Sequence, residues 1–273
     1  MFIPLEDNVS DIIGKAQRGQ GFSDSQLAEK SGVSAEKIRK LREGEFDDEA
    51  VERVAPILQL NAAALRKLAG GSWNPEAIGE LEGLAQFNTT YGDMTVNAYL
   101  AWDPASREAV AFDTGAECGG MLARIKDENL NVKLILLTHA HPDHVADLRR
   151  LRQATGAPIF ISGREEAEGA EEMEEGKRFR VGSLEIEARL TSGHSPGGMT
   201  FVLTGLSRPV AIVGDSLFAG SMGGGNVSYD DAVRNNREKI LTLPDETIVC
   251  PGHGPMTTVG EEKAHNPFFA GRV

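Results

Sequence analysis

The segment THAHPDH, residues 138–144, places three histidines and one aspartate within seven positions. It directly follows the apolar run LILL, residues 134–137, which is typical of a fully buried strand. It precedes residues 145–153, where apolar side chains recur at helical spacing and predict an amphipathic helix. The four polar side chains therefore lie on one loop between a strand and a helix, where functional residues are often found.

The spacing of these four side chains predicts two metal positions. His139 and His141 are two residues apart, so in extended backbone they project from one side and can bind the same ion. The adjacent Asp143 and His144 diverge toward another position. The loop therefore carries ligands for two ions rather than for one.

Three more segments carry candidate ligands at the ends of predicted strands. His194 lies in SGHSPGG, Asp215 ends the strand PVAIVG, and His253 lies in PGHGP after the strand TIVC. Glycines beside these side chains allow the backbone to turn sharply toward a shared centre. Imidazoles and carboxylates in this mixture suit zinc, iron or manganese. The sequence therefore predicts a metal centre from seven residues: His139, His141, Asp143, His144, His194, Asp215 and His253.

Strands dominate the chain from Met94 onward, with few helices between them. MTVNAYLAW and AVAFDTG predict a hairpin that turns at Asp103-Pro104. Five further runs predict strands, namely PIFIS, LEIEARL, MTFVLTG, PVAIVG and TIVC. The acidic stretch at 164–178 carries seven glutamates, and we interpret it as a solvated helix or loop rather than as a metal site.

The first part of the chain carries short helical patterns and no recognisable strand. Within residues 22–60 the apolar side chains are spaced as two short helices that are broken at Ser31-Gly32-Val33. Ser23 and Ser34 directly precede these two helices. They are suited as N-caps, because a serine hydroxyl can accept a hydrogen bond from a free backbone amide in the first turn.

Two further helices are predicted at 48–59 and 61–69. The glycines and serine at 70–72 then indicate a linker. The sequence therefore divides into a helical domain at 1–70 and a second domain at 71–273.

Composition limits the classes of partner. The formal charge is −13, from 28 Lys and Arg against 41 Asp and Glu. This charge disfavours electrostatic attraction between the whole chain and the phosphates of nucleic acid. No stretch approaches the roughly 18 apolar residues of a membrane span, and the N-terminus lacks a secretion signal, so no membrane partner is expected. Cys118 and Cys250 lie far apart and outside any C-x-x-C motif, which suits a reducing cytoplasm.

Residues 94–269 resemble the metallo-β-lactamase superfamily and, within it, the glyoxalase II-like hydrolases. The motifs that carry the resemblance are VNAYL, THAHPDH, SGHSPGG, GDSLFAGS, LTLPDETIVCPGHGP and TTVGEEKAHNPF. The resemblance implies an α+β fold, the four-layer αβ/βα sandwich of two mixed sheets with helices outside, here with a small all-α N-terminal domain. It places the metal centre at one edge of the sandwich.

The resemblance also implies a role for each candidate ligand. His139, His141 and His194 would bind a first divalent metal ion, and Asp143, His144 and His253 a second, with Asp215 as the bridge. The expected ions are two zinc ions, with iron or manganese as alternatives. Asp143 and Asp215 are the expected catalytic residues, since Asp143 would also orient the nucleophile.

The implied activity is hydrolysis of a small thioester or related acyl ester by a metal-bridging hydroxide. Two departures from the family argue against glutathione as the thiol carrier: residues 222–226 replace a Gly-Arg-Thr-Asp stretch, and no basic C-terminal helical region follows His253. One alternative is a persulfide dioxygenase, with one iron held by His139, His194 and Asp215. The other is a ligand-sensing regulator that binds DNA.

GFSDSQLAEKSGVSAEKIRKLREGEF resembles the helix-turn-helix domains of phage repressors. In that family the second helix, here 34–42, enters the major groove, and Lys37, Arg39 and Lys40 would reach the DNA. Residues 1–70 contain 10 Lys and Arg against 12 Asp and Glu, whereas DNA readers are usually basic. DNA binding through residues 22–44 therefore competes with a role of the helices in docking or in forming a homodimer.

Overall fold

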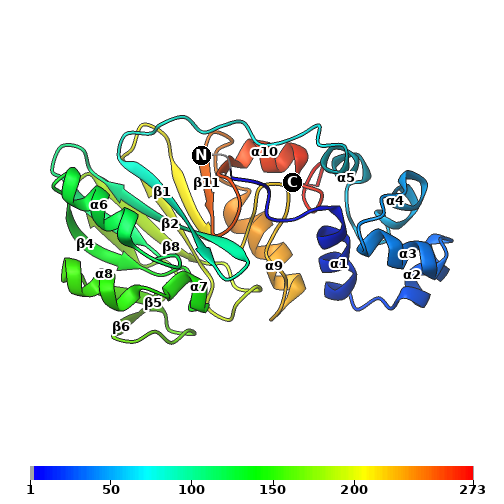
Figure 1. The fold of residues 1–273 in the computed structure, drawn as a ribbon, viewed down its shortest axis with the longest axis horizontal. Coiled ribbons are helices and arrows are strands. Elements are labelled where there is room, and N and C mark those ends of the chain that lie inside the picture. The colour runs from blue at the N-terminus through cyan, green and yellow to red at the C-terminus, as the bar shows by residue number, and fades with distance from the viewer. Residues whose placement is uncertain (1–2, 273) are drawn as a thin grey trace.

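The computed structural model describes residues 3–272 as two β-sheets that face each other, with helices on both outer sides (Figure 1). The first sheet has β1 (Leu84–Tyr91), β2 (Met94–Trp102), β3 (Glu108–Phe112), β4 (Asn131–Leu136), β5 (Ile159–Ser162) and β6 (Ala170–Met173), in that order. The second sheet has β7 (Arg178–Val181), β8 (Leu184–Leu190), β9 (Met199–Thr204), β10 (Val210–Gly214), β11 (Ile248–Pro251) and β12 (Thr257–Thr258). Its spatial order is β12-β11-β10-β9-β8-β7.

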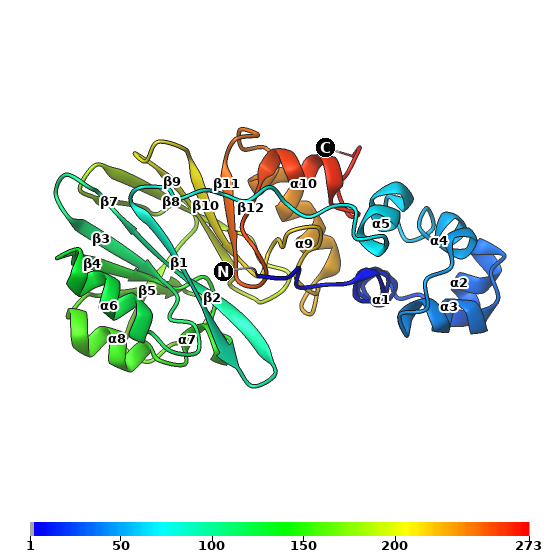
Figure 2. The same ribbon diagram turned by 45° about the horizontal axis from the view of Figure 1, so that its top comes forward.

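The helices lie outside the two sheets, and the first five form a group at one end of the molecule (Figures 1 and 2). Their bounds are α1 (Val9–Gly19), α2 (Asp24–Ser31), α3 (Ala35–Arg42), α4 (Asp48–Val54), α5 (Ala62–Ala69), α6 (Gly119–Asp127), α7 (Pro142–Val145), α8 (Leu148–Thr155), α9 (Tyr229–Asn235), the π-helical turn η1 (Asn236–Ile240) and α10 (Val259–His265). Helices α6 and α8 cover the first sheet, and α9 and α10 cover the second (Figures 1 and 2). The expected α+β four-layer arrangement is confirmed.

Three clusters of buried apolar side chains fill the interfaces between these layers. One lies between the sheets, where the rings of Phe112 and Phe201 are 5.5 Å apart. A second joins the first sheet to α8, through residues such as Ile135 and Leu151. The third covers the outer face of the second sheet and continues into α1 to α5. Burial of apolar surface in these clusters is the main force that holds the layers together.

Parallel strand pairs bring the candidate ligands to one edge. β3 pairs with β4, and β10 pairs with β11, both in parallel. The carboxyl ends of β4, β10 and β11 are followed by His139, Asp215 and His253 respectively. The predicted hairpin is also confirmed, because β2 and β3 pair in antiparallel fashion across the turn at Asp103.

The helical region begins as its capping residues predict. The Ser23 side chain accepts from the Gln26 amide, and the Ser34 side chain accepts from the Lys37 amide. Gly32 between the two helices has a φ of 68°, a left-handed conformation that favours glycine. The pattern of polar caps around short apolar runs therefore predicted α2 and α3 correctly.

The basic side chains that would reach DNA already have acidic partners within the helical region. Lys37 Nζ lies 2.9 Å from an oxygen of Asp47, and Arg39 Nε lies 3.6 Å from an oxygen of Glu43. Lys40 Nζ lies within 4 Å of both Glu36 and Glu45. These pairs reduce the positive electrostatic potential of α3. DNA binding through residues 22–44 stays a prediction, and so does the formation of a homodimer.

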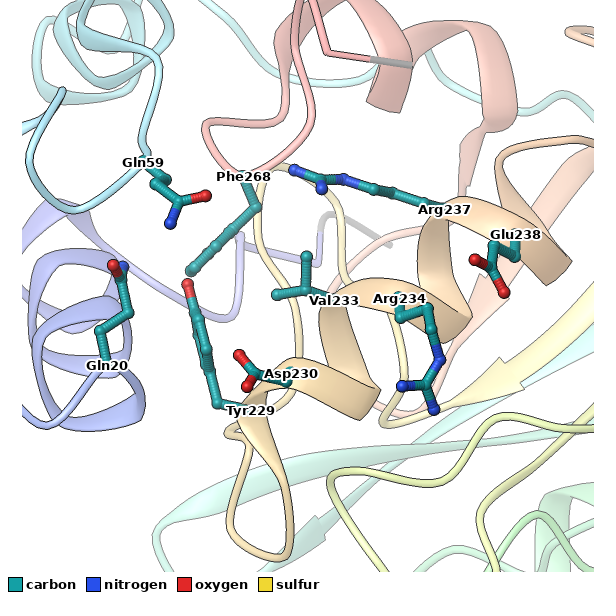
Figure 3. A pocket seen from close by; sticks show the side chains of 9 residues that line it. All are labelled: Gln20, Gln59, Tyr229, Asp230, Val233, Arg234, Arg237, Glu238 and Phe268. Carbon is teal, nitrogen blue, oxygen red and sulfur yellow. The ribbon is translucent and has the colours of Figure 1, made fainter.

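The helical region shares its core with the second sheet. Its buried apolar residues, such as Ile12, belong to the same cluster as Val213 of β10 and Phe269 near the C-terminus. Figure 3 shows Tyr229 of α9 and Phe268 between Gln20 at the end of α1 and Val233. The domain boundary near residue 70 stays a prediction, and within residues 3–272 one apolar cluster continues across it.

Two local expectations are wrong in part. The acidic stretch at 164–178 is not only solvated helix or loop, because Ala170–Met173 form the edge strand β6, paired with β5. The helix expected at 145–153 is observed as α7 followed by α8. The break falls at Asp147, whose amide donates to the Thr114 hydroxyl instead of to a carbonyl of the preceding helical turn.

No helix among residues 3–272 is long and apolar enough to cross a membrane.

Glu262 gives a test of how the C-terminal helix supports the loop after Asp215. Its fully buried carboxylate accepts from the Gly220 amide at 3.0 Å, the Asn266 side chain at 2.7 Å and the Thr257 hydroxyl at 2.8 Å. We expect Glu262→Ala to lower the free energy of unfolding by about 2–4 kcal/mol, because three buried donors lose their acceptor.

Glu262→Gln is the matched control. The glutamine oxygen can still accept from Gly220 and Asn266, and its amide can donate to the Thr257 hydroxyl, so the loss is expected to stay below about 1 kcal/mol. Denaturant unfolding of both variants measures the difference. Equal losses in the two variants would contradict this account of the network.

Candidate metal centre

All seven predicted ligands meet at one edge of the two sheets. Their ligand atoms form two groups, each with its members within 4.8 Å of one another. The first group is His139, His141, His194 and Asp215, and the second group is Asp143, His144 and His253. The structure thus brings all seven candidate ligands together, and the two groups match the division that the family resemblance implies.

The first group is a compact set of imidazoles around one point. His141 Nδ1 lies 3.0 Å from His139 Nε2 and 3.0 Å from His194 Nε2. These three nitrogens come from the loop after β4 and from the loop between β8 and β9. Neutral imidazole nitrogens that converge in this way are suited to bind a divalent cation.

The second group faces the first. Asp143 Oδ2 lies 3.4 Å from His253 Nε2 and 3.6 Å from His144 Nε2. The side chain of His144 is fully buried, whereas 12% of the Asp143 side chain is exposed. Among these three residues, Asp143 is therefore the one nearest to solvent.

Asp215 stands between the two groups. Its Oδ2 lies 3.3 Å from His194 Nε2 and 3.4 Å from His253 Nε2, while its Oδ1 lies 3.3 Å from His144 Nε2. One carboxylate thus reaches ligand atoms of both groups with its two oxygens. This is the geometry that a bridging ligand requires.

The donor set fits a pair of cations. Among residues 3–272, His144 Nε2 and Asp215 Oδ1 are buried and have no hydrogen-bond partner. Buried polar atoms are usually satisfied, so two such atoms that point at one another across 3.3 Å indicate a missing charged partner. The mixture of imidazole and carboxylate donors suits zinc, iron or manganese.

Asp113 was not among the residues predicted from the sequence, and it positions His144. Asp113 Oδ2 lies 2.8 Å from His144 Nδ1, and the carboxylate also accepts from the amide and hydroxyl of Thr138. A carboxylate on the far nitrogen of a ligating histidine fixes its tautomer and orientation. The sequence signal was the DTG that ends the strand AVAFDTG, at the same sheet edge as the ligands.

Backbone carbonyls orient two other histidines. His253 Nδ1 lies 2.6 Å from the Thr95 carbonyl oxygen, and His194 Nδ1 lies 3.1 Å from that of Gly224. Both ring nitrogens that face the carbonyls must carry hydrogen, so Nε2 is the nitrogen of each ring that can bind a cation once it carries no proton. Gly224 lies in the 222–226 segment that departs from the family pattern.

The loop that carries His253 is held by the first sheet. The Asn97 side chain donates to the carbonyls of Pro251 and Gly254 at 2.9 and 2.8 Å, and the Tyr99 hydroxyl donates to Pro251 at 2.7 Å. Gly252 is required here, because a Cβ would lie 2.1 Å from Asp215 Oδ1. The backbone itself therefore packs against the bridging carboxylate.

Charges inside the centre divide the histidines into two kinds. Burial lowers the pKa of His139 and of His194, so both stay neutral. Burial also opposes charge on His144 and His253, but the charge of Asp215 raises their pKa values to about 10 and about 11, and the hydrogen bonds of His144 to Asp113 and of His253 to the Thr95 carbonyl act in the same direction. Burial would raise the pKa of Asp215, but His144 and His253 hold it well below its usual range.

Comparison with known proteins agrees with this geometry. The sequence profile described as the Metallo-beta-lactamase superfamily matches residues 91–253. This match covers more than half of the chain and includes all seven candidate ligands. The protein belongs to the metallo-beta-lactamase superfamily.

Three relatives illustrate the range of the similarity. The hydroxyacylglutathione hydrolase GloC of Haemophilus influenzae is 32% identical over 198 residues, which cover 63% of this chain and 92% of GloC. The crystal structure of ETHE1 from Myxococcus xanthus is 27% identical with a TM-score of 0.61, covering 68% of this chain and 85% of that one. A di-iron-bound form of TTHA1623 is 30% identical with a TM-score of 0.56, covering 67% and 100%.

Asp113 predicts a selective loss of metal. We expect Asp113→Asn to lower the affinity of the second group by about 10- to 100-fold, because His144 loses the carboxylate that orients it. The first group should keep its affinity. Metal titration of the metal-free protein, with the exposed Asp127→Asn as the control, measures both. An equal loss at both groups would contradict a specific role at His144.

The pKa directions predict that the two groups respond differently to pH. At pH 7 the metal-free protein carries protons on His144 and His253, whose pKa values are raised, and a cation must displace them. The affinity of the second group should therefore rise with pH between 6 and 9, by roughly tenfold per unit for each proton released. In the first group, His139 and His194 have lowered pKa values and carry no proton that a cation must displace, so its affinity should change less with pH.

Calorimetric titrations in buffers of different ionisation enthalpy count the protons released on binding. The second ion should release protons at pH 7, and the first should release few. A binding heat that does not depend on the buffer for either ion would contradict the assignment of protons.

Proposed function

We propose that the protein is a metal-dependent hydrolase of a small thioester or related acyl ester. The observation that carries this proposal is the position of Asp215, whose two oxygens lie within 3.4 Å of ligand atoms in both groups. A centre of this kind suits two cations, and two cations suit acyl hydrolysis. The similarity to GloC, a hydroxyacylglutathione hydrolase, supports the thioester class.

Two bound cations would supply a water of lowered pKa and would polarise the acyl carbonyl. The residues of the chain do the rest. Asp143 is partly exposed at the centre and can accept a hydrogen bond from an attacking water and so orient it. A thiol leaving group needs little protonation near pH 7, because thiol pKa values lie near 8.5. No additional strong acid is then required.

Exposure indicates the side from which a substrate approaches. The side chains of His139, His144 and His253 are 2%, 0% and 6% exposed, whereas those of Asp143 and His194 are 12% and 14% exposed. His141 is also partly exposed, so the open side of the centre is lined by Asp143, His141 and His194. We infer that the acyl group enters there.

Zinc is the proposed metal, because hydrolysis involves no electron transfer and zinc is redox-inert. Zinc also binds mixed imidazole and carboxylate ligands. Iron is the alternative that the di-iron form of TTHA1623 supports. The choice does not alter the roles proposed for Asp143 and Asp215, which depend on charge and position.

The competing function is a persulfide dioxygenase with one iron on His139, His194 and Asp215. That function gives no role to the second group, whose three members nevertheless converge within 4.8 Å beside the first. The complete second group favours the hydrolase.

Loss of His253 separates the two functions. In a two-metal hydrolase, His253→Ala should reduce the metal content from two ions toward one and lower kcat/KM by about 100- to 1000-fold, because charge stabilisation of the transition state is lost. In a one-iron dioxygenase the same change should leave the metal content near one and much of the activity intact.

Asp215→Asn is the companion variant, and it should weaken both groups because an amide offers one neutral oxygen in place of two charged ones. Metal analysis and a panel of thioesters and esters, measured beside oxygen uptake with a persulfide, give the readout. Two ions retained in His253→Ala would contradict the ligand assignment, and failure of the metal-loaded protein to hydrolyse any acyl substrate would contradict the function.

A further inference from the structure

The loop that follows the bridging carboxylate, residues 216–226, contacts a candidate ligand in each metal group. Its Gly224 carbonyl accepts from His194 Nδ1 at 3.1 Å and so orients a histidine of the first group. Its Phe218 ring lies edge-on to the ring of His253, a histidine of the second group, with centroids 5.7 Å apart. The position of this one loop therefore affects both groups.

The 216–226 loop cannot hold its own shape well. Residues 223–225 are three consecutive glycines, and glycine loses more backbone freedom on ordering than any other residue. Close packing requires the first of them, because a Cβ on Gly223 would lie 1.8 Å from the Asp215 carbonyl oxygen and 3.1 Å from His194 Nδ1. A loop of this composition keeps one conformation only where neighbouring segments anchor it.

The helical region anchors this loop through an N-terminal strap, residues 4–8. Figure 2 shows the strap running from α1 to the ends of the strands of the second sheet. A Cβ built on Gly254 would lie 3.2 Å from the Glu6 amide nitrogen, so the strap also packs on the loop that carries His253. Asp7 of the strap accepts from the Ser221 hydroxyl at 2.5 Å.

Lys15 of α1 is the cation at which these contacts meet. Its Nζ pairs with Asp7, donates to the Met222 carbonyl at 2.9 Å and lies 5.1 Å from the centre of the Phe218 ring. The Lys15 and Asp7 side chains are 15% and 8% exposed, so solvent and salt screen their interaction less than that of a surface pair. An ammonium group over an aromatic face is also attracted to it. One side chain of the helical region thus holds the 216–226 loop at two points.

We propose that Lys15 is a positioning residue for the metal centre: by anchoring the 216–226 loop, it sets the orientation of His194 and His253. Through the Met222 carbonyl it holds the glycines that orient His194. Through the Phe218 ring it supports the face of the loop that packs on His253. The inference concerns how the chain holds its cations, and it does not depend on which bond the centre hydrolyses.

Lys15→Met tests the proposal, because methionine keeps an apolar stem of similar length and removes the ammonium group. We expect the affinity for Zn²⁺, titrated into the metal-free protein, to fall by about tenfold at both groups, since contacts behind the ligands tune metal affinity by that order. The visible absorption of the cobalt-substituted protein should also change, because it reports the geometry of the ligands around the ion. A purely structural lysine would lower thermal stability and move neither readout.

Lys30→Met is the matched control. Lys30 Nζ lies 5.8 Å from the centre of the Phe22 ring, so this change also removes an ammonium group from an aromatic face. Lys30 belongs to α2, which lies at the end of the helical region far from the sheets (Figures 1 and 2). Metal affinity and the cobalt spectrum should stay at their wild-type values. A loss equal to that of Lys15→Met would contradict a specific role of Lys15.

A double variant keeps the test valid if Lys15→Met folds poorly. The single change leaves Asp7 buried without its cation, which is costly. Lys15→Met combined with Asp7→Asn removes both charges, and the asparagine oxygen can still accept from Ser221. This variant should unfold near the wild-type temperature and still bind Zn²⁺ about tenfold more weakly. Wild-type affinity and an unchanged cobalt spectrum in the folded double variant would overturn the inference.

These readouts separate the inference from the proposed function. A metal-loaded protein that hydrolyses no acyl substrate would contradict the hydrolase proposal alone. The changes in Zn²⁺ affinity and in the cobalt spectrum would still decide whether Lys15 positions the centre, because neither measurement requires turnover.

Discussion

The structure depends on one buried carboxylate, Asp215, held between imidazoles that come from three different loops. A charge in this position is tolerable only if cations or protonated histidines surround it, because an isolated buried carboxylate is strongly disfavoured. Each sheet contributes to that surrounding: the first supplies the loop after β4, and the second supplies the loops after β8, β10 and β11. The two sheets must therefore meet at this edge, and the apolar cluster between them keeps them there.

Hydrogen bonds to the ring nitrogens that face away from the centre hold the candidate ligands in place. Asp113 fixes His144, and backbone carbonyls of Thr95 and Gly224 fix His253 and His194. These partners lie on strands or on loops packed against strands, where position is set by the sheet rather than by flexible chain. The centre is thus preorganised by elements that would form the sandwich in any case.

The helical region packs against the two-sheet sandwich and shares its apolar core. Its apolar residues continue the core of the second sheet, and its N-terminal strap reaches the loop beside His253. The same region therefore serves packing and approaches the site of chemistry. The basic residues of α3 are paired with acids at the end of the same helix and on the loop that follows it, which suits a structural role better than contact with a polyanion.

The sequence by itself determined the candidate metal ligands, the strands that carry them and the caps of the short helices. These features depend on local spacing, glycines beside ligands and apolar periodicity, all of which are visible in a few consecutive residues. The edge strand β6 was missed because its glutamates face solvent and hide the pattern. The roles of Asp113 and of the strap were decided only by tertiary structure. Asp113 lies 31 positions from His144, and Asp7 lies 214 positions from Ser221, so no local pattern could reveal that these side chains meet. Contacts of that kind form when packing brings distant segments together, and their energy depends on geometry that spacing in the chain does not record.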